Sequence, residues 1–300
     1  MRDFAGFTGG HMKFATYLRH TAASGLANAV LYQTPQSRTV PDNIFNDHDG
    51  PTIAELRPFP AYFVSGEDWF ILDGAGIDPT GAPVINLIQD FRYADPKHPL
   101  HTCLGRRALR ICVSDALAEA VRQRANGEVH VIENGIELSE VPARRPLAAP
   151  ARVLVAGLKN PEVARALAAR LDGLAEIDLL TEPLPRLIFL ARMAEASVCV
   201  LLPLEQEGFF LPPLEAMALG RCIVTVDCYG NRAYCRPGEN CLMPVYDAGA
   251  LAAAVLALVH DGAQMEQLAA GGLKTAAEHS IEKERAAYHA LLARHLGSRS

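Results

Sequence analysis

Short runs of consecutive apolar residues alternate along the chain with longer segments whose apolar positions recur at helical spacing. Continuous apolar runs without polar alternation are typical of parallel strands that are buried on both faces. In the first half of the chain this pattern predicts strands at 29–32, 61–64, 84–88, 111–113 and 129–132. It also predicts helices at 12–23 and 115–124, the second of them capped by Ser114.

A proline-rich segment, residues 140–150 (EVPARRPLAAP), interrupts this pattern and predicts a linker. Beyond it the alternation returns, with predicted strands at 153–156, 177–180, 198–202 and 223–226, and predicted helices at 161–171, 187–196, 212–219, 249–260 and along the tail 265–296. Strands that alternate with helices indicate an α/β fold. We therefore predict two Rossmann-like domains, 1–142 and 150–300, that face a central cleft, with the tail helix packing back on the first domain.

The chain of 300 residues is 50% hydrophobic and 21% charged, which is ordinary for a globular protein of two domains. Its net charge of −6 disfavours nucleic acid as a partner, because phosphate binding needs clustered cations. The sequence shows no apolar run of about 20 residues, as a membrane span needs, and no signal-peptide pattern. We expect a cytoplasmic protein.

The chain has seven cysteines, and five or six residues separate each of the last four from the next, Cys222, Cys228, Cys235 and Cys241. Cysteine pairs that bind zinc are usually about two to four residues apart. We therefore expect reduced thiols with a structural role, and no metal site.

Residues 201–220 (LLPLEQEGFFLPPLEAMALG) carry the most chemical information. A strand is predicted to end near Leu202, and a helix is predicted to begin near Pro212 and to end at Gly220. The loop between them then presents the backbone N–H groups of residues 208–211 at a helix N-terminus. Such groups form a site for an anion.

Two glutamates flank this predicted anion site. Glu207 precedes the helix, and Glu215 is expected in its first turn. Carboxylates repel an anion but accept hydrogen bonds from hydroxyl groups. The combination suits a ligand with phosphates between two hydroxyl-bearing parts, as in a nucleotide sugar. A glutamate in a first helical turn also favours the helix dipole, so a structural role for Glu215 stays open.

The segment EGFFLPPLEAMALGRCIV resembles the EGFGLPxLEAMAxGxPVV signature of family 4 glycosyltransferases, which are retaining enzymes of the GT-B fold. Three further segments resemble family motifs in the same order along the chain: RICVSDAL at 110–117, VIENGIEL at 131–138 and PGENCLMP at 237–244. The resemblance spans roughly residues 84–260, with a weaker echo at Gly9-Gly10. It implies a compact GT-B protein with an acceptor domain followed by a nucleotide-sugar donor domain.

The resemblance also implies roles for individual residues. Glu207 contacts the hydroxyls of the donor sugar, and Glu215 binds the ribose of the nucleotide. An N-terminal glycine loop, Gly9-Gly10, approaches the diphosphate, since glycine permits close backbone approach. The backbone N–H groups expected to hold sugar or phosphate oxygens belong to Gly208, Phe209, Phe210 and Leu211.

This sequence departs from the family pattern at two places. Where the family commonly has a histidine at the end of an acceptor-domain strand, this chain has Gln89, followed by Asp90, which is a candidate substitute or a solvated turn carboxylate. Where the family has an arginine on the diphosphate, this chain has Leu158, and Lys159 is the nearest cation. Lys159 and the helix N-terminus together would hold a diphosphate more weakly. Arg232 is a further candidate phosphate contact, or a solvated loop arginine.

The implied reaction is the transfer of a sugar from a UDP-, GDP- or dTDP-linked donor to a hydroxyl of a glycan, a lipid-linked acceptor or a small molecule, in glycan, polysaccharide or glycoconjugate biosynthesis. It needs no cofactor and no metal. The basic run at 92–110 could meet a phosphorylated or lipid-linked acceptor or an anionic membrane surface on its inner face, or form a solvated helix face.

Other functions stay open. A non-catalytic nucleotide-sugar or glycan binder would explain the departures at Gln89 and Leu158. A nucleotide-sugar epimerase would need a titrating acid and base, and no convincing pair stands out. A dinucleotide-dependent oxidoreductase is disfavoured, because no G-x-G-x-x-G follows a predicted strand.

Overall fold

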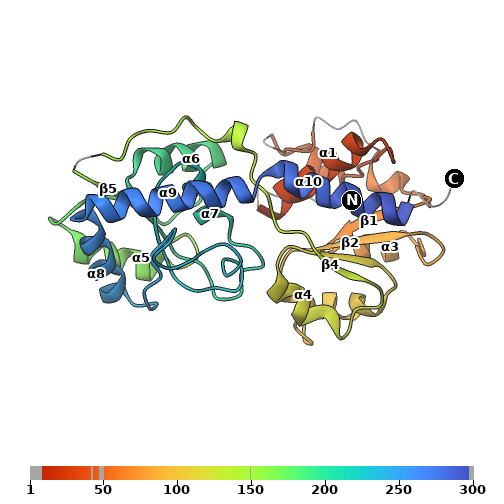
Figure 1. Cartoon of the computed structure of the whole chain (residues 1–300). Helices are drawn as coiled ribbons and strands as arrows, with labels where there is room; N and C mark the ends of the chain where they lie inside the picture. Colours follow the sequence, from red (N-terminus) through yellow and green to blue (C-terminus); the bar gives the residue numbers. More distant parts are fainter. Residues whose placement is uncertain (1–8, 42, 47–50, 149, 297–300) are drawn as a thin grey trace. The chain divides into compact units, whose positions relative to one another are not determined.

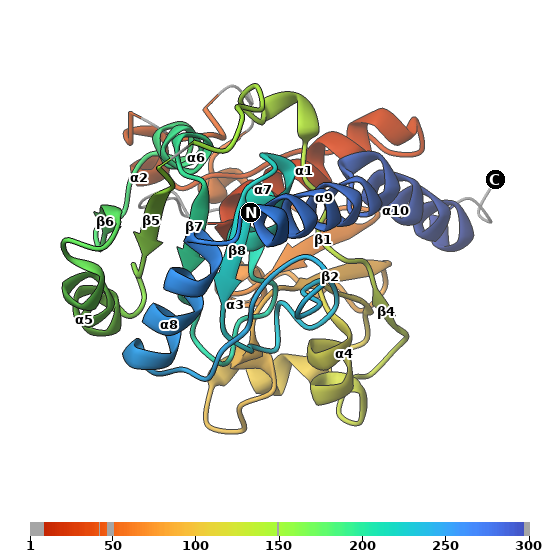
Figure 2. The ribbon, with the colours of Figure 1, turned by 60° about the vertical axis from the view of Figure 1, so that its left-hand side comes forward.

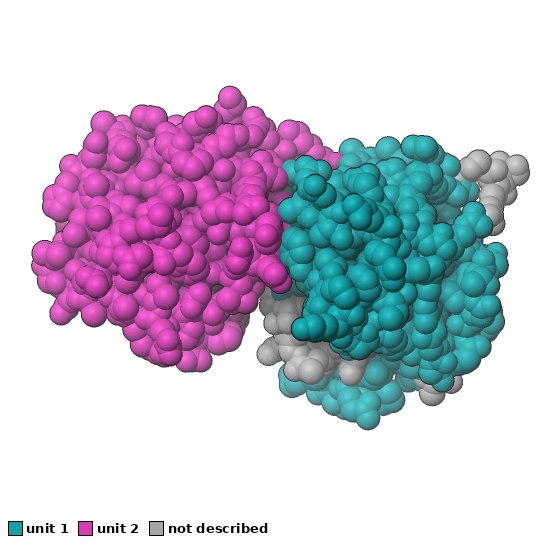
Figure 3. Space-filling model, turned by 90° about the horizontal axis from the view of Figure 1, so that it is seen from below, with its two compact units in different colours: residues 1–134, 284–300 teal, residues 135–283 magenta. Residues whose placement is uncertain are grey.

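A computed structural model describes residues 9–41, 43–46, 51–148 and 150–296. The chain forms two compact units, the first of residues 1–134 with 284–300 and the second of residues 135–283 (Figures 1 and 3). The division differs from the boundaries expected from sequence. Residues 135–142, assigned to the first domain, lie in the second unit, and residues 284–300, part of the tail expected to pack back on the first domain, belong to the first unit.

The second unit is built on a parallel four-stranded sheet with the order β6-β5-β7-β8. Its strands are β5 (Arg152–Ala156), β6 (Glu176–Leu180), β7 (Val198–Leu201) and β8 (Cys222–Thr225), as the apolar runs predict. From β5 the chain moves to one side to form β6, and it then returns past β5 to form β7. The strand order therefore reverses between β5 and β7.

Helices cover both faces of this sheet (Figure 2). Successive strand residues point to opposite faces, so Val153 and Val155 pack with α5 and α8, whereas Leu154 packs with α6 and α7. This explains why β5, β7 and β8 are largely apolar, whereas the edge strand β6 also contains Glu176 and Asp178. The helices of the unit are α5 (Pro161–Leu171), α6 (Arg186–Glu195), α7 (Leu211–Ala218), α8 (Ala248–Val259) and α9 (Gly262–Glu278), with a 3-10 turn at Leu138–Glu140.

The first unit has its own parallel sheet, whose strands follow one another in chain order, β1-β2-β3-β4. They are β1 (Tyr62–Ser65), β2 (Val84–Ile88), β3 (Leu109–Cys112) and β4 (Val129–Val131). The helices are α1 (Gly9–Ser24), α2 (Pro35–Arg38), α3 (Asp68–Gly74), α4 (Asp115–Arg122) and α10 (Ile281–Leu296), with 3-10 turns at Ile53–Glu55, Phe91–Tyr93 and Pro99–Gly105. Parallel sheets with covering helices in both units confirm the predicted α/β fold.

The strand predicted at 29–32 is wrong. The segment is irregular, and the neighbouring Gln33 makes a single isolated bridge with Thr52. Leu31 and Tyr32 are nevertheless buried. Their apolar character therefore serves side-chain packing rather than a strand ladder, a distinction that apolarity alone does not carry.

The tail is helical, as predicted, but it breaks into α9 and α10 at His279–Ser280. There the backbone pairs with Ile136: the Ile136 N–H donates to His279 O and the Ile281 N–H donates to Ile136 O, both at 2.9 Å. Gly135 permits this approach, because a Cβ at that position would lie 2.5 Å from Ser280 O. The break thus depends on a distant segment.

A buried ion pair fixes the returning helix within the first unit. Lys13 of α1 donates to the carboxylate of Glu284 of α10, and both side chains are almost fully buried. Burial lowers the pKa of Lys13, and the Glu284 charge opposes this shift. Among the described residues no single helix is long and apolar enough to span a membrane. Helices α8 and α9 together reach that length and apolar composition, but the chain bends by 103° between them.

Candidate functional site

A lysine and a glutamate meet where the strand order of the second unit reverses. Lys159 follows β5 and Glu207 follows β7, so both lie beyond the carboxyl ends of neighbouring parallel strands. The Lys159 Nζ donates to Glu207 Oε1 at 2.6 Å and to Oε2 at 2.7 Å. Ligands of open α/β sheets bind at such a reversal. The structure therefore brings together two residues that the sequence assigns to donor binding.

The two partners of this pair differ in exposure. The Glu207 side chain is 12% exposed, and that of Lys159 is 48% exposed. Glu207 Oε1 also accepts the backbone N–H of Leu204 at 3.2 Å, which holds the carboxylate in place. The lysine can therefore move away from a fixed carboxylate.

Gly230 shapes the loop that carries Glu207. The Phe210 N–H donates to Gly230 O at 3.0 Å, and a Cβ on Gly230 would lie 2.8 Å from Glu207 O. The buried Tyr234 hydroxyl also donates to Phe210 O. The Phe210 N–H is thus engaged within the protein, contrary to the predicted contact with a ligand.

Helix α7 begins at Leu211, with Pro212 and Pro213 next. Proline has no N–H, so the first turn offers fewer donors than an ordinary helix. Among the described residues no acceptor takes up the N–H groups of Gly208, Phe209 and Leu211. These three remain at the helix N-terminus as predicted.

Glu215 lies in the second turn of α7 rather than in the first, so the predicted favourable position at the helix dipole is wrong. Its side chain is 7% exposed. The Arg186 Nε donates to Glu215 Oε1 at 3.1 Å, and the Arg186 guanidinium also pairs with Glu140 at 3.0 Å. Burial raises the pKa of Glu215, and the Arg186 charge partly opposes the shift. Within the described part of the chain, Arg186 is thus the charged partner that stabilises this buried carboxylate.

Arg186 is a site residue that the motif analysis missed. It is the first residue of α6, where the helix dipole favours an anion over a cation. An arginine in this unfavourable position was the sequence feature that could have revealed it. Its partner, Glu215, lies on another helix. Arg232, by contrast, forms a two-point pair with Asp227 at 2.9 and 2.6 Å and stacks on Tyr229. Its side chain is 47% exposed, so Arg232 is a solvated loop arginine that is also paired within the protein.

The first unit holds a polar pocket of about 570 Å³ that Gly10, Ser65, Gln89 and Asp90 line in part. The Gln89 amide donates to Gly10 O and to Ser65 Oγ, both at 3.3 Å. The structure thus joins Gly10 and Gln89. Gly9 and Gly10 are, however, the first described residues of α1 and do not form a loop before it. His11, the next residue, lines the same pocket and was missed, although it directly follows the two glycines.

Asp90 has a structural task in this pocket. Its carboxylate caps the 3-10 turn that follows by accepting the Arg92 N–H at 2.9 Å. It also accepts two hydrogen bonds from the Arg92 guanidinium, at 2.9 and 2.8 Å. A carboxylate engaged in this way is poorly placed to act on a substrate.

The second unit matches a family of known enzymes. Residues 136–261 match the family model described as glycosyl transferases group 1. This region contains Lys159, Arg186, Glu207 and Glu215. The second unit is similar to glycosyl transferases of group 1 over this region, which is less than half of the chain. Gly9, Gly10, Gln89 and Asp90 lie outside the matched region.

Solved structures show the fold of the whole chain. HepE of Anabaena, solved in complex with UDP-glucose, superimposes with a TM-score of 0.71 over 98% of this chain and 98% of its own, at 14% identity. Sucrose-phosphate synthase of Thermosynechococcus elongatus gives a TM-score of 0.62 over 81% of this chain and 75% of its own, at 17% identity. The fold is that of GT-B glycosyltransferases, as the resemblance implies.

A third structure is larger than this chain. A point mutant of TarM of S. aureus, solved with Fondaparinux, alpha-GlcNAc-glycerol and UDP, gives a TM-score of 0.58 at 14% identity. The match covers 76% of this chain and 55% of TarM. Among curated proteins, none matches the chain.

Outside the matched region, two cations of the basic run at 92–110 are engaged within the first unit, whereas Arg92, Lys97 and Arg107 are exposed. Arg110 is fully buried, where its guanidinium donates to Asn86 Oδ1 at 2.6 Å and to Cys103 O at 3.1 Å. Arg106 pairs with Asp73 at 2.7 Å. The run folds as a strand and 3-10 turns, so it does not form the helix that the expected solvated helix face requires.

A second pocket of the first unit is apolar. It has a volume of about 490 Å³, and its lining includes Phe14, Leu18, Val30 and Phe63. Phe14 and Phe63 lie on α1 and β1, the same two elements that supply Gly10 and Ser65 to the polar pocket. The two pockets therefore lie along the same pair of elements.

Proposed function

We propose that this chain transfers a sugar from a nucleotide-sugar donor to a hydroxyl acceptor with retention of the anomeric configuration. The observation that carries the proposal is the pair of Lys159 and Glu207 at the strand-order reversal, beside the N-terminus of α7. A cation for phosphates and a fixed carboxylate for sugar hydroxyls lie within one hydrogen bond of each other. The similarity to group 1 glycosyl transferases supports this assignment.

Donor binding would exchange the partners of this pair. A diphosphate attracts Lys159, whose exposed side chain can turn toward it. The free N–H groups at the start of α7 donate hydrogen bonds to the phosphate oxygens. Glu207 is then released to accept hydrogen bonds from the sugar hydroxyls. The leaving diphosphate is stabilised electrostatically without a titrating group.

We propose UDP as the nucleotide. The support is that HepE and TarM, which share the fold, were solved with UDP-glucose and UDP. The buried Glu215 supplies a carboxylate for the ribose hydroxyls, with Arg186 holding it in place. Hydrogen bonds to a buried carboxylate are electrostatically stronger than the same bonds in water.

For the acceptor we propose a glycan intermediate linked to a lipid, as in polysaccharide or glycoconjugate biosynthesis. The polar pocket at Gln89 and His11 suits the reacting hydroxyl, and the apolar pocket at Phe14 and Val30 suits a hydrocarbon chain. A free sugar would leave the apolar pocket without a function. The reaction uses Gln89 only as a hydrogen-bonding group, because an amide does not titrate.

The test is nucleotide release from UDP-sugars with lipid-linked acceptors, comparing the wild type with Glu207→Gln. Glu205→Gln is the matched control, since it changes an exposed glutamate of the same loop. We expect Glu207→Gln to lower kcat by about 100-fold or more and Glu205→Gln to leave it within about twofold of the wild type. Equal turnover by Glu207→Gln would contradict the assignment, and donor binding without release would identify a non-catalytic binder. The anomeric configuration of the product, read by NMR, tests retention.

A further inference from the structure

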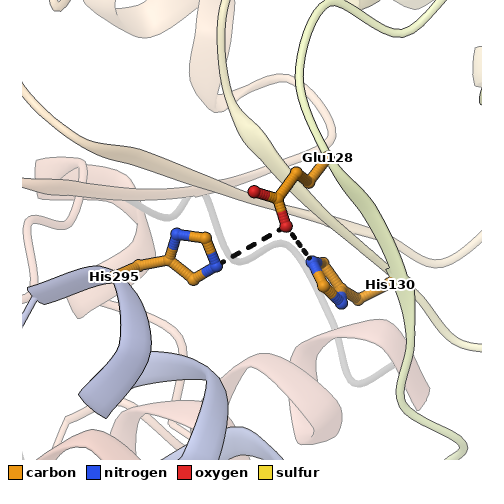
Figure 4. Close-up of side chains that lie close together, drawn as sticks. All are labelled: Glu128, His130 and His295. Atoms are coloured by element: carbon orange, nitrogen blue, oxygen red, sulfur yellow. Dashed lines mark hydrogen bonds and ion pairs between the residues drawn. The ribbon is translucent and has the colours of Figure 1, made fainter.

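Two histidines and a glutamate, none of them assigned to the donor or the acceptor, come together in the first unit (Figure 4). Glu128 directly precedes β4 and His130 lies within it. Residues two apart on an extended chain point to the same side. His295, near the end of α10, faces both of them.

The ligand atoms of the three side chains are close enough to share one ion. One atom from each residue lies within 4.8 Å of the other two. The His130 Nε2 is 2.9 Å from Glu128 Oε2, and the His295 Nε2 is 3.8 Å from the same oxygen. In a tetrahedral zinc site with bonds of about 2.0–2.1 Å, neighbouring ligand atoms are about 3.3 Å apart. The observed separations bracket that value.

The His295 Nε2 gives a second, independent indication. This nitrogen is buried and has no hydrogen-bond partner among the described residues. A buried polar atom in that condition is costly unless something binds it. A metal ion between His295 and Glu128 would satisfy it.

We propose that Glu128, His130 and His295 bind a zinc ion that joins β4 to the end of α10. Two imidazoles and one carboxylate are a donor set that zinc accepts, and three protein ligands leave a fourth position for water or another group. The site goes beyond the proposed transfer reaction and contradicts the expectation from sequence that no metal binds. That expectation considered only cysteine spacing, and His295 lies at the other end of the chain from its partners.

The charges around the site are compatible with a cation. The Glu128 carboxylate supplies a negative charge beside both histidines. The Arg294 guanidinium is 3.9 Å from Glu128 Oε2, but both side chains are largely exposed, and such pairs are weak. Glu128 and His295 also line a pocket of about 390 Å³ together with Arg107. The fourth zinc position therefore has room for water or an anionic group.

The role that follows is structural. Residues 284–300 return to the first unit after the chain has passed through the second. A zinc ion bound at β4 and at the end of α10 would hold the final turn of that returning helix. Metal binding stabilises the folded state because the unfolded chain lacks the assembled site.

The test measures zinc directly and does not depend on activity. The purified full chain is stripped with a chelator and titrated with ZnCl₂ in a calorimeter, and bound zinc is counted by mass spectrometry. The variants are His295→Gln and His130→Gln, with His260→Gln as the matched control on an exposed histidine of the second unit. Circular dichroism confirms that each variant is folded.

We expect one zinc per chain, a rise in Tm on adding zinc, and a loss of affinity of more than about 100-fold in both ligand variants but not in the control. Cobalt substitution should give a tetrahedral spectrum without thiolate charge-transfer absorption, which separates this site from the cysteines. Two results would overturn the proposal: zinc binding that His295→Gln and His130→Gln leave unchanged, or no zinc binding by the wild type.

Discussion

The sheets of the two units differ in one respect that bears directly on chemistry. In the second unit the order β6-β5-β7-β8 reverses between β5 and β7, whereas the described strands of the first unit follow chain order. At a reversal the loops after two neighbouring strands leave in opposite directions and open a space between them. Lys159 and Glu207 occupy that point. The first unit, without a reversal in its described strands, builds its polar pocket from α1 and strand ends instead.

The two units also differ in how exposed their ion pairs are. The pair of Lys159 and Glu207 joins an exposed lysine to a largely buried carboxylate, so a ligand can displace the lysine. The pair of Lys13 and Glu284 is almost completely buried and ties α10 to α1. An accessible pair at a reversal can serve binding, and an inaccessible pair between helices serves the fold. This contrast is tested by breaking each pair separately.

The largest effect is expected from Glu284→Ala. The substitution removes the carboxylate beside a buried ammonium, which costs about 3–5 kcal/mol of unfolding free energy. Urea denaturation followed by circular dichroism measures it. The double variant Lys13→Met/Glu284→Met is the control, because replacing both charges by apolar groups is often neutral or stabilising. If Glu284→Ala lowers the unfolding free energy by less than about 1 kcal/mol, the buried pair contributes no more than an ordinary surface pair.

Lys159→Met should show the opposite behaviour. The removal of one charge-assisted contact to the diphosphate costs about 1.5–3 kcal/mol, so donor affinity falls about 10- to 100-fold. Stability should change by less than about 1 kcal/mol, because the pair is partly exposed. Calorimetric titration with a UDP-sugar measures the affinity, and Lys97→Met, an exposed lysine of the first unit, is the control. If the two variants bind the donor equally well, Lys159 does not contact it.

The contrast between the units also explains what the sequence could predict. In the second unit β5, β7 and β8 are largely apolar, because helices cover both sheet faces, whereas the edge strand β6 also contains Glu176 and Asp178. Strand ends could therefore be located, and with them Lys159 and Glu207. Local motifs could not reveal Arg186, because its guanidinium binds the carboxylate of Glu215 on another helix. The need for glycine at 230 depends likewise on a loop folded against it.

In the first unit the local pattern was less informative. Leu31 and Tyr32 are apolar and buried, yet they form no strand, because packing rather than a ladder holds them. Arg110 reads as a surface cation but is buried with four acceptors, one of them Asn86. Each of these outcomes was decided by contacts that the neighbouring sequence does not specify.

A smaller effect, visible as a dependence on pH, is expected at Glu215. Its pKa in the folded protein is raised, chiefly by burial. The protonated form is therefore favoured by folding, and this contribution is complete below the unfolded pKa of about 4.3 and is lost as pH rises through the folded pKa. Wild-type stability should thus fall relative to Glu215→Gln as pH rises from about 4 toward neutrality. Urea denaturation at several pH values measures both proteins, and parallel curves would show that Arg186 fully compensates the charge.

The smallest effect is expected from Asp90→Asn. Asparagine is as good a cap as aspartate, so the turn after Asp90 should persist, and the lost pair with Arg92 is exposed and contributes about 0–1 kcal/mol. Transfer activity should stay within about threefold of the wild type, because the carboxylate is already engaged by Arg92. Activity assays on Asp90→Asn and Gln89→Ala side by side separate the two neighbours. A fall of about 100-fold or more in Asp90→Asn would show that the first unit contributes a charged group to the reaction, and the chemistry would then no longer rest on the strand-order reversal of the second unit alone.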